Sequence, residues 1–336
     1  MILVTGGAGY IGSHCVLDLL KQGYEVVIFD NLSTGHIETV NKLQNLRLKG
    51  RVADFINGDL TSKSDIDNCF KSYKIDSVIH FAAYSLVGES VVNPSKYYYN
   101  NVFGSLNLLS SMVENNVGKI VFSSTAAIYG EPEYIPIDEK HPKNPINTYG
   151  TTKLTVERIM DDFDKAYGLK SVRLRYFNVA GADESSLIGE WHEPESHLIP
   201  NILKSTFAGR KTFTVFGDTY ETKDGTCIRD YINVSDLIDA HVLALKYLDR
   251  GGETNFFNLG TKSGDSVKDV FNECEKVTGK IISVCVADKR EGDPCSLIAD
   301  NSKAKEVLGW MPKRTLNDSI KTAYEWEKTL QKYLVK

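Results

Sequence analysis

The sequence predicts an α/β protein with a doubly wound parallel sheet and a smaller α/β lobe. Short apolar runs rich in Val and Ile alternate with longer amphipathic stretches through the first half, a pattern typical of strand–helix–strand units. A glycine-rich turn, Gly6 to Gly12, follows the first apolar run directly. The chain has 336 residues, which exceeds one ordinary core and therefore favours two lobes.

The first half alternates between expected strands and expected helices. Buried parallel strands are predicted at Ile2–Thr5, Glu25–Phe29, Ser77–Phe81, Lys119–Phe122 and Ser171–Arg175. Amphipathic patterning predicts helices at 11–22, 63–72, 95–116 and 149–167. These elements are those of a Rossmann-type sheet with helices on both faces.

The pattern changes after about residue 179. Residues 182–198 are expected to form a loop because they are polar and contain Gly189 and Pro194. Helical patterning returns at 198–208, 235–249, 266–278 and 301–308, with a strand-like run at Asn255–Leu259. We therefore expect residues 1–178 to bind a dinucleotide, with returning segments near 231–260. Residues 179–230 and 261–336 would form the smaller, substrate-binding lobe.

The overall composition excludes several classes of protein. The net charge of −5, from 39 basic and 44 acidic residues, argues against a nucleic-acid-binding protein. No apolar window approaches the length of a membrane span, and the N-terminal apolar run is too short for a signal peptide. The six cysteines include no Cys-x-x-Cys, which favours reduced thiols over a disulfide framework. We expect a cytoplasmic protein without membrane or nucleic-acid partners.

A phosphate-binding turn is predicted at Gly6, Gly9 and Gly12. It lies between a strand and a helix, which is the context that a dinucleotide fingerprint requires. Asp30 follows Gly12 by 18 residues, close to the spacing of a carboxylate that binds the ribose hydroxyl groups. Such a carboxylate repels a 2′-phosphate and therefore favours NAD over NADP. Asp59 lies at a later strand end, where it could bind the adenine edge or simply form a turn.

A proton-transfer pair is predicted on the helix at 149–167. Tyr149 and Lys153 are four residues apart and share one helix face. A nearby ammonium favours the phenolate, so we expect a lowered pKa and a usable general base at Tyr149. Thr125 follows a strand, and its hydroxyl could bridge the substrate oxygen and the tyrosine.

These residues resemble the extended short-chain dehydrogenase/reductase superfamily, and within it the UDP-glucose 4-epimerase family. The resemblance runs from Met1 through at least Trp310. The matching motifs are Thr5–His14, Val78–Ala83, Val87–Ser90, Arg175–Asn178, Asp224–Thr226 with Arg229–Tyr231, and Arg290–Asp293. Several specific motifs in one order make coincidence an unsatisfactory explanation.

The resemblance implies a set of site residues. The implied catalytic residues are Tyr149, Lys153, Thr125 and Ser124. The implied NAD contacts are Gly6, Gly9, Tyr10, Ile11, Gly12, Asp30, Asn31, Asp59, Leu60, Phe81, Ala82, Ala83, Asn100, Tyr149, Lys153 and Phe177. The implied UDP-sugar contacts are Asn178, His197, Leu198, Phe213, Arg229, Arg290, Asp293 and Leu297. For the two arginines the chemistry agrees, because guanidinium binds pyrophosphate in a bidentate way.

The implied reaction interconverts UDP-galactose and UDP-glucose. The sugar is oxidised transiently at C4 with bound NAD, the ketose rotates, and the hydride returns. The family also implies a homodimer through helices 95–116 and 149–167. Leu297 occupies a position that sets the room around the sugar 2-substituent, which leaves acceptance of UDP-N-acetylhexosamines open. Ser85 stands where some members of the family carry a lysine that contacts the nicotinamide side.

The sequence argues against three alternative functions. A nucleotide-sugar 4,6-dehydratase needs an added acid and base after the threonine, but Ala126 and Ala127 stand there. A non-catalytic NAD-binding protein would not need Tyr149 and Lys153. Metal chemistry at residues 190–197 is not expected, because the His192 and His197 spacing matches no zinc signature.

Overall fold

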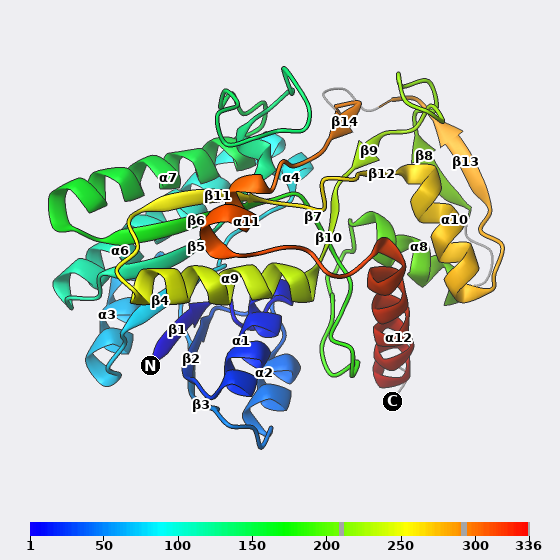
Figure 1. The fold of residues 1–336 in the computed structure, drawn as a ribbon. Helices are drawn as coiled ribbons and strands as arrows, with labels where there is room; N and C mark the ends of the chain where they lie inside the picture. Colours follow the sequence, from blue (N-terminus) through cyan, green and yellow to red (C-terminus); the bar gives the residue numbers. More distant parts are fainter. Residues whose placement is uncertain (208–211, 290–293, 335–336) are drawn as a thin grey trace.

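The central sheet confirms the predicted fold class (Figure 1). The computed structural model describes residues 1–207, 212–289 and 294–334. Seven strands follow the order β11-β6-β5-β4-β1-β2-β3, and all neighbours are parallel. They are β1 (Ile2–Thr5), β2 (Glu25–Asp30), β3 (Arg51–Asn57), β4 (Ser77–His80), β5 (Lys119–Thr125), β6 (Lys170–Tyr176) and β11 (Asn255–Leu259).

Helices cover both faces of this sheet because successive strand residues point to opposite sides. In β1, Ile2 and Val4 pack into one core cluster, whereas Leu3 packs into the other. The first cluster includes residues of α1 (Tyr10–Gln22), α2 (Ile37–Gln44), α9 (Val234–Asp249) and α11 (Ser302–Leu308). The second includes residues of α3 (Lys63–Ser72), α6 (Gly104–Glu114) and α7 (Thr148–Tyr167).

The predicted helix at 95–116 is irregular. It consists of α5 (Pro94–Tyr97), a π-helical segment (Tyr98–Phe103) and α6, preceded by α4 (Val87–Val92). A short 3₁₀ helix, Ala126–Ile128, follows β5. π-Helical turns are frequent at functional sites, and this one contains Asn100.

The second lobe contains small sheets and three longer helices. The strands are β7 (Asn178–Ala180) with β10 (Tyr231–Asn233), β8 (Phe213–Phe216) with β13 (Val284–Ala287), and β12 (Asp265–Ser266), β9 (Ile228–Arg229) and β14 (Ser296–Leu297). The helices α8 (Leu198–Phe207), α10 (Val267–Thr278) and α12 (Leu316–Leu334) share one core. Residues 302–308, predicted to belong to this lobe, instead lie against α9 and β11.

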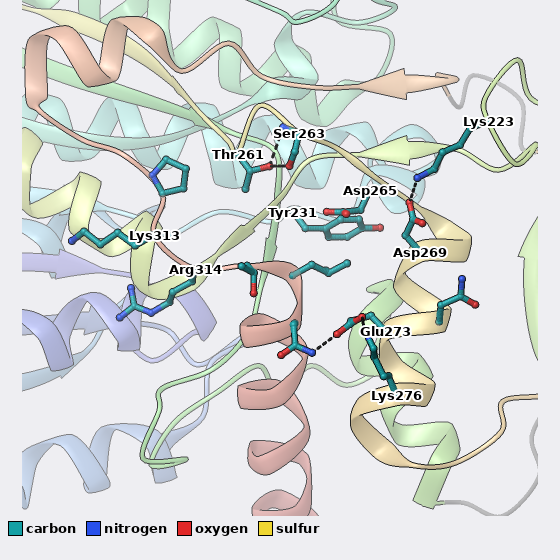
Figure 2. A pocket seen from close by; sticks show the side chains of 15 residues that line it. Lys223, Tyr231, Thr261, Ser263, Asp265, Asp269, Glu273, Lys276, Lys313 and Arg314 are labelled. Atoms are coloured by element: carbon teal, nitrogen blue, oxygen red, sulfur yellow. Dashed lines mark hydrogen bonds and ion pairs between the residues drawn. The ribbon is translucent and has the colours of Figure 1, made fainter.

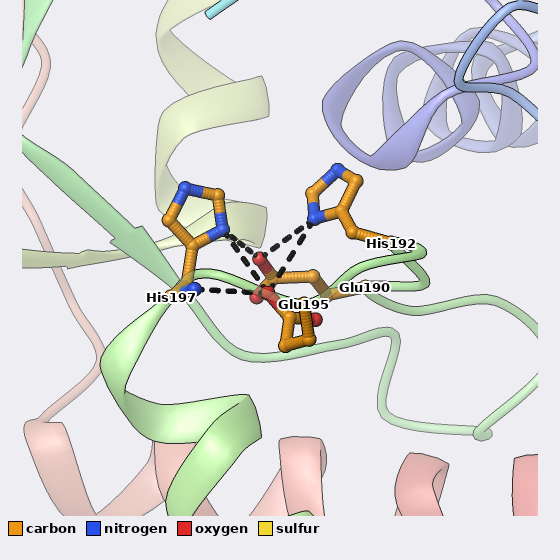
Figure 3. Close-up of side chains that lie close together, drawn as sticks. All are labelled: Glu190, His192, Glu195 and His197. Carbon is orange, nitrogen blue, oxygen red and sulfur yellow. Dashed lines mark hydrogen bonds and ion pairs between the residues drawn. The ribbon is translucent and has the colours of Figure 1, made fainter. Parts of the chain in front are cut away.

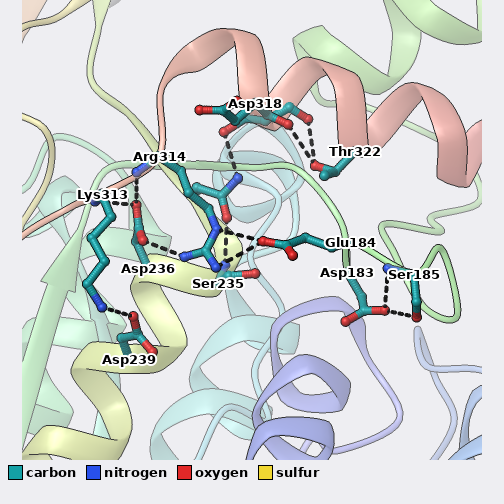
Figure 4. Close-up of polar contacts among 12 residues, drawn as sticks. Asp183, Glu184, Ser185, Ser235, Asp236, Asp239, Lys313, Arg314, Asp318 and Thr322 are labelled. Atoms are coloured by element: carbon teal, nitrogen blue, oxygen red, sulfur yellow. Dashed lines mark hydrogen bonds and ion pairs between the residues drawn. The ribbon is translucent and has the colours of Figure 1, made fainter.

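A buried carboxylate joins the two lobes (Figure 4). Asp236 in the first turn of α9 is fully buried and accepts hydrogen bonds from the backbone N–H groups of Lys313 and Arg314. The Arg314 guanidinium contacts Asp236 at 2.7 Å and Glu184 at 3.1 Å. These contacts hold the segment that leads into α12 against α9.

The sequence did not predict the limits of every element, and the longest strand and the longest helix left out are β3 and α12. Strand β3 lies at the sheet edge, where its residues are only partly buried and include Asp54. Helix α12 buries Ile320, Ala323, Trp326 and Leu330 at helical spacing. Among the described residues, no helix combines the length and apolar character needed to cross a membrane.

Candidate active site

The glycine turn brings β1, α1 and β4 into close contact. A Cβ on Gly6 would lie 2.6 Å from the Ala82 backbone nitrogen, and one on Gly12 would lie 2.0 Å from the Gly6 oxygen. Gly9 is the N-cap of α1 and provides no side-chain cap. The first N–H groups of α1, at Tyr10 and Ile11, are therefore suited to an anionic ligand.

Asp30 lies beside this turn at the end of β2. Its carboxylate accepts hydrogen bonds from the backbone N–H groups of Ala8 at 3.0 Å and Leu32 at 2.8 Å. Burial raises the pKa of Asp30, although these N–H groups act in the opposite direction. Asn31 donates to Asp59 at 2.9 Å, so the two residues expected near the adenosine contact each other.

The other predicted NAD contacts line the same edge of the sheet. Phe81, Ala82 and Ala83 follow β4 directly, and the Phe81 ring packs against His241 at 4.7 Å. Leu60 is buried beneath Gly104 at the start of α6. The Tyr10 hydroxyl donates to the Gly181 carbonyl at 2.6 Å, and Asn100 donates to Asn101.

Helix α7 begins where its tyrosine can reach the end of β5. Asn147 caps the helix by accepting from the Gly150 N–H at 2.8 Å. Gly150 packs closely on the 3₁₀ turn after β5, and a Cβ there would lie 2.5 Å from the Ala127 carbonyl oxygen. The Ser90 hydroxyl accepts from the Tyr149 N–H at 3.1 Å. These contacts hold Tyr149 beside Thr125.

Tyr149 and Thr125 form the predicted pair. The Thr125 hydroxyl lies close enough to the phenol to favour its ionised form. Burial raises the pKa of Tyr149 to about 12, and the nearby Thr125 hydroxyl acts in the opposite direction. The expected lowering of this pKa is therefore wrong for the protein alone, because desolvation of the phenolate outweighs the stabilising contacts.

Lys153 lies one helical turn beyond Tyr149. It is 2% exposed, and its Nζ is 5.9 Å from the centroid of the tyrosine ring. The ammonium donates to the Ser123 carbonyl at 2.8 Å, and it makes no other hydrogen bond to the described residues. Burial lowers the pKa of Lys153 to about 7. An ammonium carries three donors, so this one retains donors for the hydroxyl groups of a bound ribose.

Ser124 does not join the catalytic pair. It points to the opposite face of β5 from Ser123 and Thr125, as the alternation of a strand requires. Its hydroxyl is fully buried and donates to Glu157 at 2.6 Å. Glu157 on α7 also pairs with the buried Arg175 of β6 at 2.5 Å. The predicted catalytic role of Ser124 is therefore corrected: this serine helps to anchor α7 to the sheet.

One predicted sugar contact, Leu297, packs beside α7. Leu297 of β14 is the register partner of Arg229 in β9. Leu297 and Phe177 both pack against a small apolar cluster that includes Ala126 and Leu154. The second lobe therefore reaches the segment next to Thr125 through Leu297. Arg229 donates to the backbone carbonyl groups of Ile228 and Pro294.

The remaining predicted contacts lie at other positions in the second lobe. Asn178 is exposed in β7, and Leu198 begins α8. Phe213 packs edge-on against Phe271 at 5.1 Å. Arg290 and Asp293 lie outside the described residues.

A separate cavity of about 830 Å³ lies between α10 and the start of α12 (Figure 2). Its walls carry charges of both signs, including Asp265, Glu273, Lys276 and Arg314. None of the predicted site residues lines it. It is therefore distinct from the Thr125–Tyr149–Lys153 site.

The loop before α8 brings together four polar residues for which the sequence predicted no metal chemistry, and Glu195 among them was not singled out (Figure 3). Each of the four side chains provides one possible metal-ligand atom, and these four atoms lie within 4.8 Å of one another. The residues are Glu190, His192, Glu195 and His197. Burial opposes ionisation of Glu190, but the two imidazoles outweigh it and lower the pKa of this carboxyl. The carboxylates in turn raise the pKa of His192 to about 9 despite its burial. In the sequence, this cluster corresponds to the pattern Glu-x-His-x-x-Glu-x-His at residues 190–197, which could have indicated it.

Comparison with known proteins gives consistent matches over nearly the whole chain. A family model described as GDP-mannose 4,6 dehydratase matches residues 3–323. A UDP-glucose 4-epimerase of Lactobacillus helveticus is 51% identical over 329 residues, covering 98% of this chain and 97% of that protein. The solved UDP-glucose 4-epimerase of Brucella ovis, in complex with NAD, has 44% identity and a TM-score of 0.91, covering 96% and 97%. That of Bifidobacterium longum, in complex with NAD⁺ and UDP, has 38% identity and a TM-score of 0.92, covering 98% of each chain.

Proposed function

The chain belongs to the UDP-glucose 4-epimerase family, and from this premise we propose that it interconverts UDP-galactose and UDP-glucose. The observation that carries the proposal is the site itself. Thr125 and Tyr149 lie beside each other at the end of β5, with Lys153 on the same helix face as the tyrosine. The glycine turn and Asp30 lie at the same edge of the sheet.

NAD fits the residues present. Asp30 has a carboxylate at the ribose position, Gly9 leaves the start of α1 uncapped, and Lys153 keeps donors for hydroxyl groups. When bound, NAD supplies a hydride acceptor for C4 of the sugar and returns the same hydride. No net oxidant is consumed, so tight retention of the cofactor is expected.

The side chains of the protein transfer the proton and position the sugar. Tyr149 takes the proton from the sugar 4-hydroxyl, and Thr125 holds the two oxygens together by hydrogen bonding. Lys153 orients the ribose and, when charged, favours the phenolate. The resulting 4-keto sugar turns while its UDP group remains held in the second lobe. Tyr149 then returns the proton to the oxygen, giving the inverted alcohol.

Dehydration is not favoured at this site, although the matching family model carries a dehydratase description. Elimination across C5 and C6 requires an additional acid and base next to Thr125. The structure places Ala126 and Ala127 in the 3₁₀ turn that follows Thr125. Neither side chain can transfer a proton, so the 4-keto sugar has no route to a deoxy product there.

A mass balance tests the proposed reaction. Purified protein is incubated with UDP-galactose without added NAD, and the nucleotide sugars are separated by chromatography. Conversion to UDP-glucose without a keto-deoxy product supports the epimerase. Tyr149→Phe should nearly abolish turnover while NAD stays bound. The matched control Tyr167→Phe changes an exposed tyrosine on the same helix and should retain activity. Absence of conversion even with added NAD, or full activity in Tyr149→Phe, would refute the assignment.

We propose that Leu297 limits the room beside the sugar 2-substituent. It lies between Arg229 and the apolar cluster next to Thr125. Leu297→Tyr should therefore reduce turnover of UDP-N-acetylgalactosamine more than turnover of UDP-galactose. An equal reduction for both substrates would contradict this position for the 2-substituent.

We propose a homodimer in the cytoplasm. The support for the dimer is an exposed apolar face on the segment from α4 to α6, where Val92 is 81% exposed and Tyr99 59%. The Tyr99 and Phe103 rings stack at 5.1 Å on this face. Sedimentation should give twice the chain mass, and Tyr99→Glu should produce monomers. The cysteine pattern favours reduced thiols and so supports a cytoplasmic location, which cell fractionation tests.

A further inference from the structure

We propose that Glu190, His192, Glu195 and His197 bind a divalent transition-metal ion, with Zn²⁺ the best fit to the donor set. The four side chains come from one loop of eight residues and converge on a common point (Figure 3). Two imidazole nitrogens and two carboxylate oxygens form the set. None of the four residues belongs to the Thr125–Tyr149–Lys153 site, although the family resemblance assigns His197 to the UDP-sugar contacts.

The spacing of the donor atoms matches a four-coordinate ion. His192 Nδ1 lies 3.3 Å from Glu190 Oε1 and 3.8 Å from Glu195 Oε1. His197 Nδ1 lies 3.6 Å from Glu195 Oε1 and contacts Glu190 Oε1 directly. Zinc–ligand bonds of about 2.0–2.2 Å in a tetrahedron separate neighbouring donors by about 3.3–3.6 Å. Two of these four separations already fall in that range, the His192–Glu195 separation is slightly longer, and the direct Glu190–His197 contact would open to admit the ion.

The donor types select the ion. Imidazole nitrogens suit zinc and other late first-row metals, whereas calcium and magnesium prefer sites made of oxygen ligands. His192 Nδ1 is buried and has no hydrogen-bond partner among the described residues, although it points toward both carboxylates. His192 Nδ1 is ion-paired with both carboxylates, and a metal ion bound among them would give this nitrogen the direct contact that these longer pairs do not.

Neighbouring groups hold the ligands in place, as is usual around metal sites. Backbone N–H groups of Ser196 and His197 donate to Glu195 Oε1 at 2.8 and 3.0 Å. The Trp326 indole of α12 donates to the Glu190 carbonyl at 2.8 Å. The loop is thus tied to the second lobe through its backbone as well as through α8.

The position of the loop indicates a structural role for the ion. The His192 ring lies edge-on to Tyr10 in the first turn of α1, with centroids 6.4 Å apart. Trp191 stacks on His36 at 3.6 Å. A bound ion would therefore hold together a loop that contacts both the glycine turn and α12. It would also compete with the substrate role predicted for His197.

Metal content tests the proposal directly. The full-length protein is treated with a chelator, dialysed, and titrated with Zn²⁺ alone in competition with a chromophoric chelator. One ion per chain is expected. His192→Gln and Glu195→Gln should each weaken binding by at least about 100-fold. The matched control Glu193→Gln changes an exposed carboxylate of the same loop and should bind like the wild type.

Cobalt substitution identifies the ligands. Co²⁺ in this site should give the visible absorption of a four-coordinate ion, and His197→Gln should abolish it. Circular dichroism checks that each variant folds. No Zn²⁺ binding by the wild type, or equal binding by the ligand variants, would overturn the proposal. In either case the four groups would form only a cluster of ion pairs.

Discussion

Adding one methyl group at Gly150 should separate the catalytic pair. The Cβ of Gly150→Ala would lie 2.5 Å from the Ala127 carbonyl oxygen and 3.0 Å from Pro145 Cβ, whereas ordinary contact begins at 3.4 Å. The start of α7 must therefore move by roughly 0.9 Å relative to the turn after Thr125. A misplacement of about 1 Å can cost 10²-fold in rate, so we expect kcat to fall by about 10²-fold.

The assay measures conversion of UDP-galactose to UDP-glucose at saturating substrate, together with bound NAD and the melting temperature. NAD content should be retained, because the glycine turn and Asp30 lie on other elements. Overpacking should also destabilise the fold by about 1–3 kcal/mol. Gly118→Ala is the matched control, since a Cβ there meets nothing within 4 Å. A Gly150→Ala variant with unchanged kcat would show that the position of α7 relative to Thr125 does not control the reaction.

Three further predictions concern charge. In cofactor-stripped protein, Lys153→Met should increase stability most at pH 6 and least at pH 10. Burial lowers the pKa of Lys153 to about 7, so its cost to folding is full below pH 7 and fades as pH rises toward 10.5. Urea unfolding with a pH-independent difference would contradict this. Asp236→Asn should lose about 2 kcal/mol because a buried acceptor of Arg314 is altered, whereas Asp239→Asn, at a more exposed ion pair, should lose under about 0.5 kcal/mol. Equal losses in chemical denaturation would refute the difference. Asp30→Ser should narrow the preference for NAD over NADP in cofactor exchange, and an unchanged preference would exclude Asp30 as the discriminating carboxylate.

The sheet was predictable because its strands are buried on both faces. Short apolar runs such as Ser77–Phe81 are typical of buried parallel strands, and the strand–helix order then restricts the topology. The limits of strand β3 were not predicted, because an edge strand is only partly buried and can contain polar residues such as Asp54. The apolar residues of helix α12 recur at helical spacing from Ile320 to Leu330, so this helix could have been predicted from the sequence.

The candidate site was predictable only where short-range spacing determines geometry. Tyr149 and Lys153 share a helix face, and Thr125 ends a strand at the edge where parallel sheets bind ligands. The period of two along β5 was also available, and it separates Ser124 from Thr125. The cluster around Glu190 was not predictable in the same way. Its four residues meet because a loop folds back on itself, and no periodic pattern specifies such a path.

Residue spacing along the chain does not predict the pKa values of Tyr149 and Lys153. Proximity alone predicts that Lys153 stabilises the Tyr149 phenolate. Burial, however, opposes both charged forms, since it raises the pKa of Tyr149 to about 12 and lowers that of Lys153 to about 7. The protein alone therefore favours a neutral phenol beside an amine that is only partly protonated at neutral pH. Any charge that a ligand adds next to Tyr149 acts in this poorly solvated region, where electrostatic effects are stronger than in water. The base is thus expected to become effective only when the site is filled, which would restrict proton transfer to the bound substrate.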